Sequence, residues 1–158
     1  MIAGLQALRG IQKVSATTLV AELGPLSRFS RPKQLMGYSG MVSSENSTGS
    51  SVRRGAITKT GNAHVRRIVG EAAWAYQYRP AMSPPLKKRQ QGLSEEVKEI
   101  AWKAQHRLCS RYRRLTAKGK VRQKIATAIG RELLGFVWAI GRQVEKELAD
   151  KKLHGRAA

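Results

Sequence analysis

The stretch VRQKIATAIGRELLGFVWAIGRQVEKEL, residues 121–148, decides the fold of this chain. Its apolar residues recur every three or four positions, which places them along one side of an α-helix. These residues are Ile125, Ile129, Leu133, Phe136, Val137, Ile140 and Val144. A long helix with such a stripe must bury it against other elements, so the stretch predicts a helical core.

A second long helix is predicted immediately before this one. Ser94 is a suitable N-cap residue, and apolar residues follow it at helical spacing as far as Leu115. The segment Lys118-Gly119-Lys120 supplies a turn between the two helices. We therefore predict a long antiparallel helical hairpin and tail over residues 93–158, with the apolar seam inside and the arginines outside.

Further toward the amino terminus, residues 79–92 contain three prolines and the basic run Lys87-Lys88-Arg89, which indicate an exposed basic connector. Before the connector, Asn62 is a suitable cap for a helix with an apolar stripe. The stripe consists of Val65, Ile68, Val69, Ala72, Ala73 and Tyr76. Three nearby aromatic residues fit either a core or a platform on which bases stack. They are Trp74, Tyr76 and Tyr78.

The first turns of that helix carry His64, Arg66 and Arg67. Cations at the amino end of a helix oppose its dipole, so these residues are expected to serve an anionic ligand. From Met41 to Thr60 the chain is rich in serine, threonine and glycine, which predicts a loop, although Gly55-Ala56-Ile57-Thr58 within it fits a short strand. Because basic residues border it, the loop fits either a linker or a segment that handles phosphates.

The amino-terminal region has the pattern of a helix-hairpin-helix, although Gln12 stands where the usual hairpin has glycine and a plain helical hairpin would give a similar pattern. Residues 2–9 have helical spacing, Gly10 opens a turn, and Ser15 is expected to cap a helix that ends at Gly24-Pro25. A further short helix is expected after Ser30, its cap, and Pro32. Backbone N–H groups at such a turn bind phosphate. The candidate phosphate-binding residues are Gly10, Gln12 and Lys13.

The charge of the chain favours a polyanionic partner. Lysine and arginine number 30 against 10 acidic residues, for a net charge of +20. Residues 1–50 hold five basic and two acidic residues, whereas residues 101–158 hold fifteen and four. A field of this strength attracts phosphate backbones, although a membrane-surface protein can be equally basic, so charge alone does not identify the partner. The densest basic surface is expected in the last third of the chain.

The composition also excludes several classes of site. The only aspartate is Asp150, and the glutamates look like solvated helix-face charges, so a carboxylate metal site within the chain is not expected. A single cysteine, Cys109, excludes an internal disulfide and is expected to fill apolar space. The sequence shows neither a membrane span nor a secretory signal, so we expect a cytoplasmic, nucleoid-associated protein of a bacterial cell.

Six motifs follow one another along the chain: LRGI (8–11), ATTLVAELG (16–24), LMGYSGM (35–41), ENSTG (45–49), GAITKTGN (55–62) and RRIVGEAAW (66–74). In order and spacing they resemble the carboxy-terminal domain of DEDD-type insertion-sequence transposases, relatives of the Piv DNA invertase. The final predicted helix resembles the same family, so the resemblance covers nearly the whole chain.

The resemblance implies a concrete chemistry. Full-length members combine a RuvC-like nuclease domain, with an acidic tetrad for Mg²⁺, and a domain like this one that supplies a serine nucleophile. They act on DNA as oligomers guided by a structured RNA. The serine motif maps onto Ser47-Thr48-Gly49, with Ser47 the expected nucleophile and Thr48 the alternate. The basic residues expected to neutralise the phosphoryl oxygens are Arg53, Arg54 and Lys59.

We therefore expect a mainly α protein with a helix-hairpin-helix-like transposase core and serine loop (1–78), a basic connector (79–92) and a helical hairpin (93–158). The expected function is DNA binding and transposition, in a fragment lacking the acidic domain and inactive alone. Expected partners are DNA, a guide RNA, and further copies or a complementing subunit, with Mg²⁺ only in the nuclease domain. The alternatives are a non-enzymatic basic DNA- or RNA-binding module and a partner-binding helical hairpin.

Overall fold

The computed structural model describes residues 1–48 and 51–154, with the backbone alone for residues 46–48 and 51–54. Its described elements are helices apart from one strand pair, so the predicted mainly α class is confirmed. In chain order they are α1 (Ile2–Leu5), α2 (Lys13–Leu23), η1 (Leu26–Arg28), α3 (Pro32–Tyr38), β1 (Ser43–Thr48), β2 (Ser51–Ile57), α4 (Ala63–Ala73), η2 (Trp74–Gln77), α5 (Pro84–Arg89), α6 (Glu95–Ala117) and α7 (Arg122–His154).

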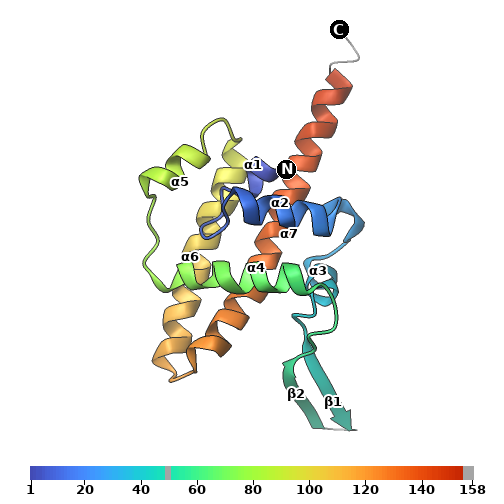
Figure 1. The fold of residues 1–158 in the computed structure, drawn as a ribbon, viewed down its shortest axis with the longest axis vertical. Coiled ribbons are helices and arrows are strands. Elements are labelled where there is room, and N and C mark those ends of the chain that lie inside the picture. Colours follow the sequence, from blue (N-terminus) through green and yellow to red (C-terminus); the bar gives the residue numbers. More distant parts are fainter. Residues whose placement is uncertain (49–50, 155–158) are drawn as a thin grey trace.

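Helix α7 is the element around which the others are arranged (Figure 1). Helices α1, α3, α4 and α6 all pack against it. Five residues of the predicted stripe are at most 1% exposed, whereas Phe136 and Val144 are partly buried. The five are Ile125, Ile129, Leu133, Val137 and Ile140. One continuous core therefore extends from Leu5 to Ile140 and joins the segments predicted from the sequence.

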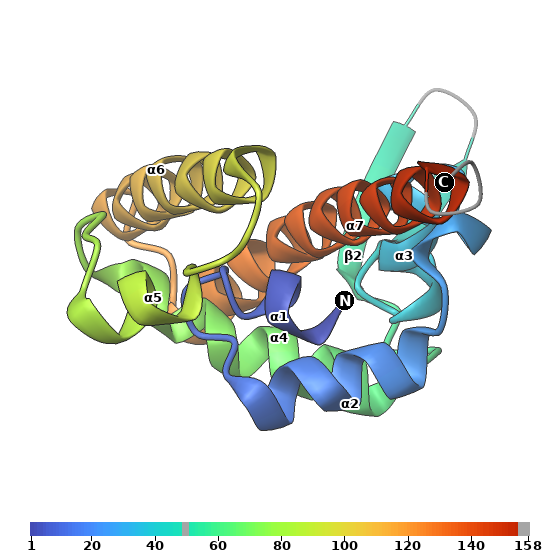
Figure 2. The same ribbon diagram turned by 90° about the horizontal axis from the view of Figure 1, so that it is seen from above.

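Helices α6 and α7 form the predicted antiparallel hairpin (Figures 1 and 2). Ser94 caps α6 as predicted, because its hydroxyl accepts a hydrogen bond from the Val97 N–H at 3.4 Å. The turn between the helices uses Gly119 at φ +66°. Helix α7 ends at His154, six residues beyond the expected Leu148.

The stretch that composition predicted to be a loop is an antiparallel β-hairpin. Strand β1 pairs with β2 from Ser43 opposite Ile57 to Thr48 opposite Ser51, with a register shift near Ser44. Ser44 donates its hydroxyl hydrogen to the Ala56 carbonyl at 3.0 Å. Backbone pairing holds the two strands together, and the chain shows no alternating apolar pattern that would have revealed them. Figure 1 shows that the hairpin projects from the helical body.

Two glycines close the root of this hairpin. Gly40 has φ +66° and Gly61 has φ +130°, conformations that other residues rarely adopt. A Cβ on Gly40 would lie 2.5 Å from the Thr60 carbonyl oxygen, and a Cβ on Gly61 would collide with the Tyr38 carbonyl oxygen. Neither site has room for a side chain, so the root depends on glycine at both positions.

The predicted helix caps are partly right. Asn62 caps α4 by accepting a 2.9 Å hydrogen bond from the Val65 N–H. Ser15 is not a cap, because α2 begins at Lys13 after the extended residue Gln12. Ser30 is not a cap either. Residue 31 occupies the cap position of α3, and the Ser30 N–H and hydroxyl both donate to the Gln34 side chain.

The segment predicted to be an exposed connector is attached to the body in its second half. It forms α5, in which Leu86 is buried. Gln90 is also buried and donates its side-chain N–H to the Ala7 carbonyl at 3.1 Å. Arg89 donates to the Ile11 carbonyl at 3.1 Å. The prediction of exposure is therefore wrong for Leu86, Arg89 and Gln90, which fix α5 to the turn between α1 and α2, whereas the prolines and lysines of α5 are exposed as predicted.

Candidate nucleic-acid interface

A cleft lies where the base of the β-hairpin meets α7. It has a volume of about 690 Å³. From the hairpin side it is lined by Ser43, residues 55–57 and Lys59, and from α7 by Lys124, Thr127, Ala128 and Arg131. Among the described residues, three cationic side chains and no acidic one line this cleft. The cleft therefore favours an anion.

A second hollow of about 370 Å³ adjoins the first at Thr127, which lines both. It lies between α4 and the amino-terminal part of α7, and its charged residues are Arg66, Arg67 and Glu71. We call the two hollows together the basic groove. In the part of the chain that the structure describes, five cations and one carboxylate line this groove: Lys59, Arg66, Arg67, Lys124 and Arg131 against Glu71.

Lys59 has an unusual backbone at this groove. It is the one non-glycine residue with positive φ (56°) in the part of the chain that the structure describes. Its N–H donates to the Gly40 carbonyl at 3.0 Å, which holds it against the hairpin root. Strained backbone of this kind persists where the surrounding structure fixes it, and here it places the lysine at the lip of the cleft.

The cations predicted on the first turns of α4 have different surroundings. His64 Nδ1 lies 3.1 Å from a carboxylate oxygen of Glu22, and Arg66 donates to the Ser39 carbonyl at 2.9 Å. Arg67 is exposed, 3.9 Å from Glu71. Arg66 therefore stabilises the end of α3 in addition to lining the groove. Of these three cations, Arg67 is the most accessible to a ligand.

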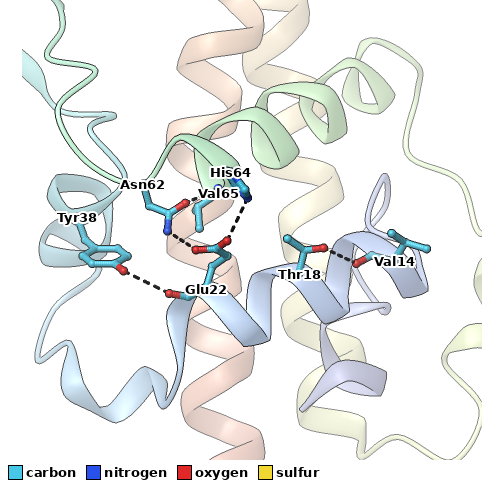
Figure 3. A network of polar contacts seen from close by, with 7 residues as sticks. All are labelled: Val14, Thr18, Glu22, Tyr38, Asn62, His64 and Val65. Carbon is cyan, nitrogen blue, oxygen red and sulfur yellow. Dashed lines mark hydrogen bonds and ion pairs between the residues drawn. The ribbon is translucent and has the colours of Figure 1, made fainter.

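Glu22 connects α2 to the start of α4 (Figure 3). Its carboxylate accepts a 2.6 Å hydrogen bond from the Asn62 side chain and contacts His64. Its backbone carbonyl accepts a hydrogen bond from the Tyr38 hydroxyl at 3.3 Å. Three segments therefore meet at one glutamate, next to the root of the β-hairpin.

Asn62→Ala is expected to lower the free energy of unfolding by about 1–2 kcal/mol, because α4 loses its cap and Glu22 loses a partner. Urea denaturation measures the change. Ser30→Ala is the matched control, since Ser30 is exposed and caps no helix, and its effect should stay within about 0.5 kcal/mol. Equal losses in the two variants would contradict the role given to Asn62.

The predicted phosphate-binding turn lies elsewhere. Gly10 has φ +84°, and a Cβ there would lie 2.6 Å from the carbonyl oxygen of Ala72, near the carboxyl end of α4. Gln12 and Lys13 are exposed at the start of α2. The hairpin root and the first turn of α4 lie at the other end of α4. The predicted candidates therefore form two groups separated by the length of that helix, about 16 Å.

The remaining predicted residues lie on the strands. The backbone places Ser47 opposite Val52 and Thr48 opposite Ser51, in the half of the hairpin away from its root. Arg53 and Arg54 pair with residues 46 and 45. The side chains of Ser47, Thr48, Arg53 and Arg54, and all of Gly49, lie outside the described part of the structure.

The aromatic residues near α4 divide between core and surface. Tyr76 is fully buried, and burial raises the pKa of its hydroxyl, so it is a core residue and offers no face to a base. Tyr78 is 62% exposed, with the Arg9 guanidinium 5.9 Å from its ring. Cys109 fills core space as expected, and burial raises the pKa of its thiol.

Sequence reasoning did not single out Lys124 and Arg131. They are seven residues apart on α7 and so share one face, with the small residues Thr127 and Ala128 between them. That spacing was visible in the sequence. What the sequence did not reveal was that the hairpin base would face this side of the helix.

Two further observations concern other kinds of site. Within residues 1–48 and 51–154, no three histidine, cysteine, aspartate or glutamate residues come together as a metal cluster would require. None of the described helices has the length and apolarity to cross a bilayer.

Comparison with known proteins places these features in context. A sequence profile of the IS116/IS110/IS902 transposase family matches residues 3–89, which include the β-hairpin and α4. The chain is also 46% identical over 146 residues to the protein named "Putative transposase y4qE" of Sinorhizobium fredii (strain NBRC 101917 / NGR234). The match covers 92% of this chain and 37% of that protein.

Proposed function

Because the chain belongs to the IS116/IS110/IS902 transposase family, we propose that it binds DNA and carries the serine nucleophile of a transposition reaction. One observation supports this above the others. The strand that contains Ser47 belongs to a hairpin whose base borders the basic groove, with Lys59, Lys124 and Arg131 around one cleft. The hydroxyl-bearing strand and a site for a polyanion therefore belong to one structural unit.

The groove supplies the binding part of this function. A phosphodiester backbone would lie along α7 and the start of α4, where Lys124, Arg131 and Arg67 neutralise its oxygens. Each neutralised phosphate releases condensed counterions, which makes the affinity depend on salt. Thr127 lines both hollows, but its hydroxyl donates to the Gln123 carbonyl at 2.9 Å, so the phosphate contacts come from the cationic side chains.

The hairpin supplies the chemical part. The Ser47 oxygen would form a bond to phosphorus while one ester oxygen of the strand leaves, so that the serine proton passes to a base and the leaving oxygen gains a proton. A serine hydroxyl is a weak nucleophile, and neighbouring cations stabilise the negative charge that develops on the phosphoryl oxygens. Thr48 is the alternate nucleophile.

The metal-dependent part of the reaction belongs, in this proposal, to a separate RuvC-like domain with carboxylates for Mg²⁺. The chain spans 37% of the length of its relative, and we propose that it is one part of a complete transposase. We further propose that the assembled enzyme is an oligomer of this protein, that it binds a guide RNA, and that it acts at the bacterial nucleoid. These assignments rest on the family resemblance.

The DNA-binding role predicts a defined salt effect. Lys124→Gln/Arg131→Gln should lower the affinity for a 20-base-pair duplex and reduce the slope of log K against log salt by about 1.8, at about 0.9 per lost phosphate contact. Fluorescence anisotropy between 50 and 200 mM salt, about the range in which such contacts weaken strongly, measures both.

The control for this experiment is Lys151→Gln/Lys152→Gln, which removes the same charge from exposed positions near the end of α7. This pair tests whether net charge alone explains binding. If the control variant loses as much affinity and slope as the groove variant, the groove is not the DNA site. If the groove variant binds duplex like the parent chain, the groove is likewise not the DNA site, and if the parent chain itself does not bind duplex even at about 50 mM salt, the DNA-binding proposal fails.

A further inference from the structure

A second basic surface lies on the carboxyl-terminal half of α6. A pocket of about 550 Å³ is present there, and four arginines line it. The arginines are Arg107, Arg111, Arg113 and Arg114, and His106 and Glu132 lie beside them. We call this surface the α6 face. Arg107, Arg111 and Arg114 are four and three residues apart and so share one side of α6, and Arg113 lines the same pocket from the adjacent side.

One carboxylate forms ion pairs with this arginine cluster. Glu132 of α7 lies 3.1 Å from Arg107 and 2.9 Å from Arg111, and its side chain is 19% exposed. Arg113 and Arg114 are exposed and have no carboxylate within 4.0 Å among the described residues. The cluster therefore holds two arginines fixed by Glu132 and two guanidinium groups available to an external anion.

An aromatic pair borders the cluster. Trp102 is 40% exposed, and its ring centroid lies 4.5 Å from that of His106 in an edge-to-face arrangement. Trp102, His106 and Arg113 are spaced four and seven residues apart, so they share one side of α6. Arginines beside an exposed aromatic ring are the combination that holds an unpaired strand, because the cations bind phosphates and the ring stacks on a base.

The α6 face is separate from the basic groove. Arg131 lines the groove, whereas its neighbour Glu132 lines the α6 pocket, so the two surfaces occupy different sides of α7. Figures 1 and 2 both show α6 well apart from the β-hairpin. A strand on the α6 face would leave the groove accessible.

We propose that the α6 face binds the sugar-phosphate backbone and a base of an unpaired nucleic-acid strand, as a second site beside the groove. Arg113 and Arg114 contact phosphates, and Trp102 stacks on a base. Guanidinium groups pair with carboxylates as well as phosphates, so the exposed Trp102, which can stack on a base, is the feature that favours a nucleic acid over an acidic protein segment. The domain would then hold two nucleic-acid segments at once.

The test uses the full chain and fluorescent 20-nucleotide probes of mixed sequence: single-stranded DNA, single-stranded RNA, and duplex DNA. Arg113→Gln/Arg114→Gln should weaken binding of a single-stranded probe by at least about 10-fold, since two charge-assisted contacts are lost. The slope of log K against log salt for this variant should fall by about 1.4, at about 0.7 per lost phosphate contact on a single strand. Whichever of the two single strands shows the larger loss identifies the source of the ligand.

Trp102→Ala separates stacking from charge. It leaves the net charge unchanged and should weaken single-strand binding by about 5-fold or more, with little effect on the duplex. Circular dichroism checks that each variant keeps the helical content of the parent chain. The Lys151→Gln/Lys152→Gln pair again controls for net charge.

The outcomes separate this inference from the DNA-binding proposal. If Arg113→Gln/Arg114→Gln binds both single strands as well as the lysine control does, the α6 site is refuted, whatever the groove variant does to duplex binding. Equal losses on single strand and duplex would also refute it. If a polyglutamate peptide competes for the site as effectively as a single strand does, the α6 site is also refuted. Loss confined to single strands supports the α6 site even if the groove variant binds duplex normally.

Discussion

Ser47→Ala is expected to reduce formation of a covalent protein–DNA product by at least about 1000-fold, because removal of an enzyme nucleophile removes most of its rate enhancement. The substitution deletes one oxygen from a strand position, so the β-hairpin should keep its pairing with Val52. The measurement uses the chain together with a carboxylate-bearing nuclease domain and Mg²⁺. A nicked DNA substrate traps the intermediate, and the adduct appears on a denaturing gel.

Two neighbouring substitutions complete this experiment. Ser44→Ala is the matched control on the same strand, because its hydroxyl donates to the Ala56 carbonyl and has no assigned chemical role. It should leave adduct formation within about threefold of the parent, as expected for a peripheral hydrogen bond. Thr48→Ala tests the alternate nucleophile. Should Ser47→Ala and Thr48→Ala both retain full adduct formation, no hydroxyl at these two positions is the nucleophile.

Gly40→Ala is expected to lower the free energy of unfolding by about 3 kcal/mol or more. The residue has φ +66°, which costs a non-glycine residue about 1 kcal/mol or more. Its Cβ would in addition lie 2.5 Å from the Thr60 carbonyl oxygen, so the backbone at the hairpin root must move. Urea denaturation measures the loss of stability. The affinity for DNA should also fall, because the Lys59 N–H is hydrogen-bonded to the Gly40 carbonyl and Lys59 lines the groove.

Gly119→Ala is a close control for that experiment. Gly119 has the same φ of +66°, but no atom lies within 4 Å of where its Cβ would be. Gly119→Ala should therefore lower the free energy of unfolding by only about 1 kcal/mol, the cost of a positive φ for a non-glycine residue. The difference between the two variants isolates the close approach at the hairpin root. Equal destabilisation would mean that the root accommodates a side chain and does not depend on glycine.

The sequence predicted those elements whose signals are local. The apolar stripe of α7 and the caps Asn62 and Ser94 depend on spacing within one segment, and the structure confirms them. Ser15 has the chemistry of a cap, but the chain enters α2 two residues earlier. There Ile11 is buried and Arg89 holds its carbonyl, a contact across 78 residues that no local pattern contains.

The candidate site was predictable only in part for the same reason. Lys59 and Arg67 were identified because they lie in or near recognisable motifs. Lys124 and Arg131 were not, since their place in the groove depends on the hairpin base packing beside α7. The serine and threonine residues of β1 predicted a loop, whereas the segment is a strand. Backbone pairing with β2 stabilises it, and the sequence has no alternating apolar residues there that would have indicated a strand.

The position of α7 in the chain has a consequence for synthesis in the cell. Helices α1, α3 and α4 bury their apolar sides against it, yet the ribosome makes α7 after all of them. At about 5–20 residues per second, the earlier segments wait for seconds before their packing surface emerges. During that interval a cationic chain with uncovered apolar residues is open to chaperones and proteases. A translation product that stops before Arg122 should therefore be degraded rather than accumulate.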